Sequence, residues 1–274
     1  MHSDPPSPAA LTQAGTLPQA VPLLLGIDTC GPSGSVALAR LAGDAVEILG
    51  QIELEGRSYS ATLVAAVGEL LARSGVELRN LAGIVAVNGP GSFTGVRVGL
   101  SAVKGLAEAA QIPVVAVSRL EVLARKAGVP ADRSSSVGWK AWVPTDRSSS
   151  VGWKAGVPSA ALDAHRHELF LRLGGSGLEA RELLAGAHEL SAIDLAGARI
   201  AVCEDAAAAL LASAWPDAEL LRTPAPTAAD ALELCAPRVV AGEFVDLALL
   251  DGHYLRRSDA EIFGEPAAAR PQPA

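Results

Sequence analysis

A glycine-rich turn between a strand-like and a helix-like segment places the strongest constraint on the fold. Residues 88–97 read Asn-Gly-Pro-Gly-Ser-Phe-Thr-Gly-Val-Arg. Before them, Leu81–Val87 has the length and the β-branched residues of a strand, and after them Val96–Ala109 has helical apolar spacing. A strand-to-helix turn of this kind leaves unpaired backbone N–H groups that can bind phosphate. The glycines can equally serve only to form a tight turn, and the spacing alone leaves both interpretations open.

The first predicted strand, Leu23–Thr29, ends in a carboxylate and a hydroxyl. A turn of small residues follows, and Val36–Ala39 and Val46–Leu54 complete a β-meander. An aspartate at this strand end is typical of the corner that holds phosphate and metal in actin-like and sugar-kinase-like ATPases, but it is also common in ordinary turns. The candidate phosphate corner comprises Asp28, Thr29, Gly89, Gly91 and Ser92.

Two predicted helices have features of either a buried layer or a protein interface. Ser60–Arg73 has one charged residue in its interior, Glu69, and Val96–Ala109 contains many small residues. Both interpretations stay open at this point. Their apolar stripes supply the candidate interface residues Leu63, Val67, Leu70, Leu71, Val96, Leu100 and Val103. A strand at Pro113–Val117 and a short helix capped by Ser118 complete an α/β half of the ribonuclease-H type.

A 14-residue repeat interrupts the chain. Lys126–Trp139 is followed directly by the near copy Lys140–Trp153, and a third copy begins at Lys154. Two copies are too few to bury the core of a solenoid. We therefore interpret residues 129–157 as an insertion in a surface loop, where extra length has a small energetic cost. A docking role for the tryptophans of the repeat is the weaker alternative; these are Trp139, Trp142 and Trp153.

The second half of the chain contains another predicted hairpin and two more helices. Its predicted elements are strands Ala160–Asp163, Glu168–Leu173 and Ile200–Cys203 and helices Ala206–Ala214 and Thr227–Ala241. Asp163, His165 and His167 alternate, which in a continuous strand would place three metal-ligand types on one face. A hairpin turn would break that face and no fourth ligand is evident, so no metal site is predicted.

Charge and composition narrow the class of protein. The net charge of −8 disfavours extensive contact with nucleic acid by this chain alone. The three cysteines are odd in number and widely spaced, which argues against a disulfide framework or a zinc finger. Residues 1–22 lack the basic start and apolar core of a secretory signal, and no run is long enough for a membrane span. We expect a cytoplasmic protein with disordered tails at 1–22 and 264–274.

Several motifs together resemble the TsaB (YeaZ) family of bacterial tRNA-modification proteins. The resemblance covers about residues 23–128 and 154–263. It rests on the segments Gly89–Arg97, Gly26–Thr29, Arg57–Ser60, Ile112–Val114, Leu162–Ala164 and Tyr254–Glu261. The sequence departs from the family at Tyr59, where histidine is frequent, and in the repeat and the long N-terminal tail.

The resemblance implies a two-domain actin-like, ribonuclease-H-like (ASKHA) α/β fold, with domains at 23–128 and 158–263. It further implies a non-catalytic subunit that pairs with the catalytic subunit TsaD and the ATPase TsaE, or forms a homodimer when the partner is absent. That complex transfers threonylcarbamoyl to the adenosine next to the anticodon in tRNAs reading codons that begin with A, and this chain would touch tRNA only indirectly. The two helices would form the interface, so Val67→Glu or Leu100→Glu would abolish partner binding and leave the fold intact.

The residues themselves argue against ATP turnover. An actin-like ATPase closes a second glycine-rich loop on the phosphates, whereas the corresponding strand end here carries Glu204 and Asp205. Carboxylates without a bridging metal would repel phosphate. No nucleophile–histidine arrangement of a peptidase is evident, and neither a cofactor nor a catalytic residue is predicted. A sugar-kinase-like enzyme and a metallopeptidase remain as alternatives.

Overall fold

The computed structural model describes residues 21–43, 45–56, 58–128, 158–174, 180–193 and 198–256. Several sequence predictions lie outside these residues. They are the tail 264–274 and nearly all of the tail 1–22, the insertion 129–157, Arg57 of the Arg57–Ser60 motif, and residues 257–261 of the C-terminal motif.

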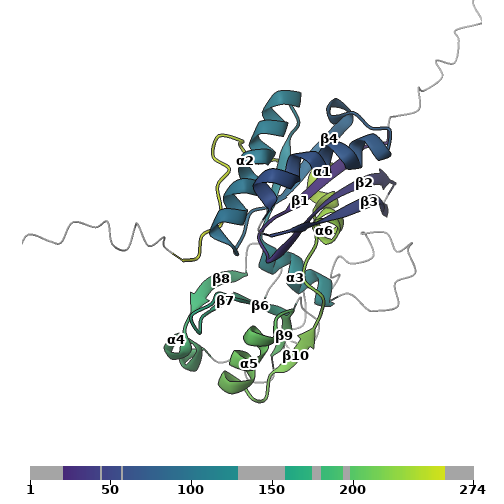
Figure 1. Ribbon diagram of the computed structural model, residues 1–274. Coiled ribbons are helices and arrows are strands. Elements are labelled where there is room, and N and C mark those ends of the chain that lie inside the picture. The colour runs from purple at the N-terminus through teal and green to yellow at the C-terminus, as the bar shows by residue number, and fades with distance from the viewer. Residues whose placement is uncertain are drawn as a thin grey trace, which may run out of the picture.

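The first sheet contains the glycine-rich turn and the predicted meander (Figure 1). Its order is β3-β2-β1-β4-β5, with β1, β2 and β3 antiparallel and β1, β4 and β5 parallel. The strands are β1 Leu23–Asp28, β2 Ser33–Ala42, β3 Ala45–Glu55, β4 Leu81–Val87 and β5 Val114–Val117. All five were predicted, and β2 is longer than predicted because its pairing with β3 extends over its whole length.

Helices cover both faces of this sheet (Figure 1). α1 (Tyr59–Arg73) packs on β3 and β2, and α2 (Phe93–Ala110) packs on β4 and β1. α6 (Ala228–Val240) contacts all five strands from the other face. Ser92 caps α2, because its Oγ accepts a hydrogen bond of 3.2 Å from the Gly95 N–H. A short 3₁₀ turn, η1 (Leu78–Asn80), leads into β4.

The second sheet repeats the topology of the first. Its order is β10-β9-β6-β7-β8, so that three antiparallel strands are again followed by two parallel ones. The strands are β6 Ser159–Asp163, β7 Leu169–Leu173, β8 Arg181–Ala185, β9 Arg199–Val202 and β10 Glu219–Arg222. α4 (Ala187–Ala192) and α5 (Asp205–Ala214) share a core with one face, and α3 (Arg119–Gly128) shares a core with the other. The predicted hairpin is confirmed as β6 and β7.

Each domain buries one helix that was assigned to the other domain from the sequence. This corrects the predicted domain boundaries at 23–128 and 158–263. α3 was assigned to the first domain, but its Leu120 and Leu123 share a core with Leu162 and Phe170 of the second sheet. α6 was assigned to the second domain, but its apolar side chains join the core of the first sheet. Each helix is amphipathic, and amphipathicity specifies a buried face but not the sheet that buries it.

Candidate functional site

The residues of the candidate phosphate corner lie together and are closely packed. Asp28 is fully buried, and its Oδ1 accepts a hydrogen bond of 2.8 Å from the Cys30 N–H. The hydroxyl of Thr29 donates to the Gly95 carbonyl at 2.7 Å, and the Ser92 N–H donates to the Cys30 carbonyl at 2.8 Å. The β1–β2 turn and the loop before α2 are therefore bonded to each other.

Glycines make this close approach possible. A Cβ at Gly91 would lie 2.2 Å from the Cys30 carbonyl oxygen, and one at Gly95 would lie 2.1 Å from the Thr29 carbonyl oxygen. Gly89 adopts a positive φ of 113° ahead of a cis bond to Pro90. The glycines seat the first turns of α2 against the end of β1, as the tight-turn interpretation requires.

Arg119, which the sequence did not single out, lies beside the corner. It is the first residue of α3, is 2% exposed, and its Nε is 3.6 Å from Asp28 Oδ2. Burial lowers the pKa of Arg119, but the charge of Asp28 and weaker contributions from its other neighbours outweigh burial and raise it. The side chain stays charged, and the Asp28 carboxylate is neutralised by the protein itself.

The second domain presents the matching turn opposite the first. Asp163 at the end of β6 accepts a hydrogen bond from the His165 N–H at 2.8 Å, as Asp28 does at the end of β1. Glu204, at the N-terminus of α5, accepts a hydrogen bond of 2.5 Å from the Asp163 N–H. Burial raises the pKa of Glu204 above its usual value, although this bond and the charge of Arg119 oppose the shift. A glutamate therefore stands where the first domain has its glycine-rich loop.

The alternating Asp163, His165 and His167 do not share a strand face. His165, Arg166 and His167 all have positive φ and form the hairpin turn. Nδ1 of His165 lies 3.1 Å from Oδ2 of Asp163, and both histidines are exposed. Within the described residues, no group of three or more histidine, cysteine or acidic side chains is placed to share a metal ion.

Residues 251–256, here called the connecting segment, link the two domains at the edge of the cleft that lies between them. The His253 N–H donates to the Asn88 carbonyl at 2.7 Å in the first domain, and the ring Nε2 of His253 lies 2.8 Å from Glu182 Oε2 in the second. Arg256 pairs with Glu168 of the hairpin. Tyr254 accepts a hydrogen bond of 3.3 Å from Arg97 Nε. The segment therefore forms part of the cleft wall.

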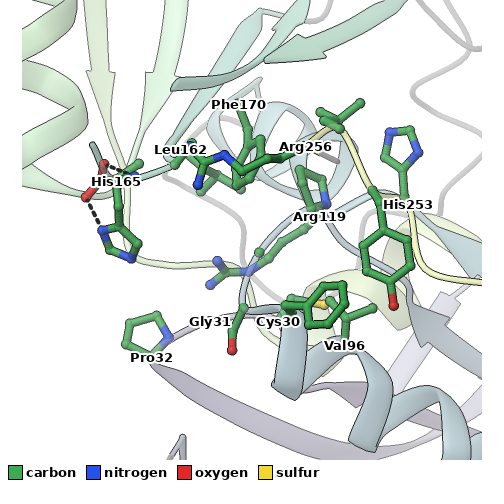
Figure 2. Close-up of a pocket in the computed structure, with 18 of the residues that line it drawn as sticks. Cys30, Gly31, Pro32, Val96, Arg119, Leu162, His165, Phe170, His253 and Arg256 are labelled. Atoms are coloured by element: carbon green, nitrogen blue, oxygen red, sulfur yellow. Dashed lines mark hydrogen bonds and ion pairs between the residues drawn. The ribbon is translucent and has the colours of Figure 1, made fainter. Parts of the chain in front are cut away.

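The two turns, α3 and the connecting segment enclose a cavity of about 980 Å³. Figure 2 shows Arg119 between Gly31 and the hairpin turn that carries His165. The thiol of Cys30 also lines this space, but it donates to the Val87 carbonyl at 3.3 Å, and burial raises its pKa well above the usual value. A thiol in that state is a poor nucleophile, which argues against cysteine chemistry here.

The side chains predicted to contact a partner are buried inside the first domain, which corrects that prediction. None is more than 7% exposed, and all belong to the first core; they are Leu63, Val67, Leu70, Leu71, Val96, Leu100 and Val103. The apolar stripes of α1 and α2 face the sheet because burial there removes them from water. Val67→Glu and Leu100→Glu would place a charge in the core and are expected to impair folding.

The outer surfaces of α1 and α2 include several small residues. Val64 is 60% exposed, and Gly68 and Gly105 are exposed glycines in helix interiors. A Cβ at either glycine would meet no atom within 4 Å, so packing in the single chain does not explain them.

Among the helices that the structure describes, none has the length and hydropathy to cross a bilayer.

Glu182 lies at the edge of the cleft, where three side chains form hydrogen bonds to its carboxylate. Its environment predicts that the free energy of unfolding decreases in acid. Burial raises its pKa, but hydrogen bonds from His253, Ser118 and Arg172 outweigh burial and lower it. A depressed folded-state pKa adds stability that is present above the unfolded pKa, about 4.3, and is lost as the pH falls through the folded value. We expect Glu182→Gln to flatten the decrease in unfolding free energy between about pH 6 and pH 3. Urea denaturation at each pH measures this, and an unchanged slope would contradict it.

The duplicated sheet order, the exchanged helices and the cleft between two aspartate-ended strands define a two-domain actin-like α/β protein. A YeaZ structure from Pseudomonas aeruginosa superposes with a TM-score of 0.61 at 25% identity, over 85% of this chain and 100% of that one. A second P. aeruginosa structure, described as similar to peptidase YeaZ, gives a TM-score of 0.62 at 27% identity, over 86% and 100% of the two chains. These structural matches, together with the sequence matches below, support the TsaB (YeaZ) family for this chain.

Sequence comparisons agree with the structural ones. The tRNA threonylcarbamoyladenosine biosynthesis protein TsaB of Haemophilus influenzae is 38% identical over 104 residues, 38% of this chain and 42% of that protein. TsaB of Escherichia coli is 35% identical over 104 residues, 38% of this chain and 43% of that protein. The matched segment thus spans less than half of these relatives. The sequence model of the TsaD family, described as tRNA N6-adenosine threonylcarbamoyltransferase, matches residues 49–136.

Proposed function

We propose that this chain is a non-catalytic subunit of the complex that transfers threonylcarbamoyl to the adenosine next to the anticodon in tRNAs reading codons that begin with A. Its partners are a TsaD-like catalytic subunit and a TsaE-like ATPase, and it forms a homodimer when they are absent. It acts in the cytoplasm and contacts tRNA only through the complex. The names of the TsaB relatives support the pathway, and the net charge of −8 supports the indirect contact with tRNA.

The ion pair between Asp28 and Arg119 carries the non-catalytic part of the proposal. In an actin-like ATPase the aspartate at this strand end serves the metal and phosphates, so it has to be accessible. Here it is fully buried, and a guanidinium within 3.6 Å already balances its charge. At the second turn Glu204 stands where an actin-like ATPase has its second glycine-rich loop, so the N–H donors of such a loop are missing there.

The outer faces of α1 and α2 are the proposed docking surface. A glycine inside a helix destabilises it by about 0.5–1 kcal/mol relative to alanine. Gly68 and Gly105 destabilise their helices in this way, although no neighbouring atom in the chain requires a glycine at either position. The helices of a partner can approach closely at these positions, where three exposed alanines and one exposed serine also lie: Ala61, Ala65, Ala72 and Ser101.

The non-catalytic assignment predicts that the purified chain alone does not turn over ATP. With Mg²⁺ and ATP at saturating concentration, we expect a rate at least about a thousandfold below the roughly 1–100 s⁻¹ of kinases. A phosphate-release assay measures the rate, and TsaE-like ATPase from the same source is the positive control. Turnover near about 1 s⁻¹ that co-purifies with the chain would overturn the proposal.

A further inference from the structure

The cavity between the domains has the properties of a small-molecule site. Its volume of about 980 Å³ lies at the upper end of the range for ligand pockets. Leu162 and Phe170 line it from the second domain and Val96 from the first (Figure 2). Phe93 of the first domain and Leu255 of the connecting segment complete this lining. These side chains present an apolar and partly aromatic wall.

Arg119 supplies a buried polar group aimed into this space (Figure 2). A guanidinium has five N–H donors, and buried donors are nearly always hydrogen-bonded. Among the described residues, none forms a side-chain hydrogen bond with Arg119, although the side chain is 3% exposed. The separation of 3.6 Å between Nε and Asp28 Oδ2 exceeds a hydrogen bond, and neither atom has a partner. Asp28 therefore balances the charge of Arg119 but accepts no hydrogen bond from the guanidinium.

The described lining of the cavity has more arginines than acids. The acids are Asp163 and Glu204, and of the four arginines Arg119 lies beside Asp28 and Arg256 pairs with Glu168. The arginines of the lining are Arg97, Arg119, Arg166 and Arg256. Arg97 lies over the Phe93 ring with its Cζ 3.7 Å from the ring centroid. This guanidinium at the rim of the cavity therefore forms a cation–π contact.

We propose that this cavity binds a small organic anion, whose carboxylate or phosphate pairs with the Arg119 guanidinium and whose apolar or aromatic body packs against Leu162 and Phe170. Guanidinium binds either oxyanion through two parallel hydrogen bonds. Binding needs no Mg²⁺, because Arg119 already neutralises the Asp28 carboxylate that would hold the metal. This ligand site goes beyond the docking role proposed above and does not depend on it.

Calorimetric titration of the full chain tests the proposal with four probes, without Mg²⁺. AMP carries a phosphate on an aromatic body, benzoate a carboxylate on one, inorganic phosphate lacks the body, and adenosine lacks the charge. We expect AMP or benzoate to saturate one site with a Kd below about 1 mM, and inorganic phosphate and adenosine to bind at least about tenfold more weakly. AMP against benzoate identifies the preferred oxyanion. No saturable binding of either, or binding only with Mg²⁺, would overturn the proposal.

Two variants locate the site. Arg119→Lys keeps the charge but loses the planar fork, and it should weaken binding by about tenfold or more. Leu255→Trp fills the cavity without touching the ion pair and should abolish binding, whereas Leu249→Trp, at a leucine that is 80% exposed and outside the lining, should not. Wild-type affinity in Leu255→Trp would contradict the assignment even if Arg119→Lys fails to fold.

Discussion

Asp28→Asn is expected to lower the free energy of unfolding by about 3–5 kcal/mol. Asparagine keeps the shape of the side chain and can still accept the hydrogen bond from the Cys30 N–H. What is lost is the negative charge beside Arg119, which is 2% exposed. An uncompensated buried guanidinium is strongly destabilising, and this is the reason for the large effect. Urea denaturation at pH 7 gives the value.

Two further variants separate the ion pair from general effects of the substitution. Glu47→Gln removes a partner of Arg40 in a surface pair whose side chains are 44% and 50% exposed, and it should cost no more than about 1 kcal/mol. The double variant Asp28→Asn/Arg119→Met removes both charges and should recover most of the stability. A loss below about 1 kcal/mol for Asp28→Asn, or no recovery in the double variant, would contradict the account of this pair.

Val64→Glu is expected to weaken binding to the TsaD-like subunit by at least about 100-fold, which is roughly 2.7 kcal/mol. The side chain is 60% exposed on α1, so a charge there meets water in the free chain but would be buried against a docked helix. Stability of the free chain should change by no more than about 0.5 kcal/mol. Isothermal titration of the catalytic subunit measures the affinity.

Val240→Glu is the matched control, because Val240 is also a helical valine, 63% exposed, at the end of α6. It should bind as the wild type does. Gly68→Ala adds a second criterion: it should stabilise the free chain by about 0.5–1 kcal/mol and still weaken binding. Equal affinity for Val64→Glu and wild type would remove α1 from the interface.

The sequence predicted most of the secondary structure because the signals are local. The strand Leu81–Val87 was recovered at its exact bounds, and the predicted cap of α3 forms, because Ser118 Oγ accepts a hydrogen bond of 3.2 Å from the Leu120 N–H. β8, β10 and α4 were missed. β8 and β10 are the edge strands of the second sheet, with mostly half-buried or exposed residues and no strong apolar alternation.

The interface residues show where pattern reasoning fails. The apolar stripe of a helix indicates that one face is buried, and Leu63 and Val103 lie on such faces. The stripe does not distinguish burial against the protein's own sheet from burial against a partner. The docking surface proposed above rests on a weaker signal on the opposite face: Gly68 and Gly105, where a Cβ would meet no atom within 4 Å.

Arg119 could not be found from its neighbours in sequence. It follows Ser118 at the start of α3 and has no motif around it. Its role depends on two tertiary facts, the exchange of α3 to the second domain and the return of its first residue to the end of β1. Gly31 takes part as well, because a Cβ there would lie 2.4 Å from Arg119 Nη2.

The most direct test is formation of threonylcarbamoyladenosine in a reconstituted reaction containing threonylcarbamoyl adenylate as the donor, ATP, the TsaD-like and TsaE-like subunits, tRNA, and either wild-type chain or one variant. If the chain acts through the outer face of α1 and α2, Asp28→Asn/Arg119→Met supports modification at close to the wild-type rate and Val64→Glu supports almost none. The opposite pattern, activity with Val64→Glu and none with the folded double variant, would show that the cleft between the domains takes part in the reaction and would contradict the proposed non-catalytic role.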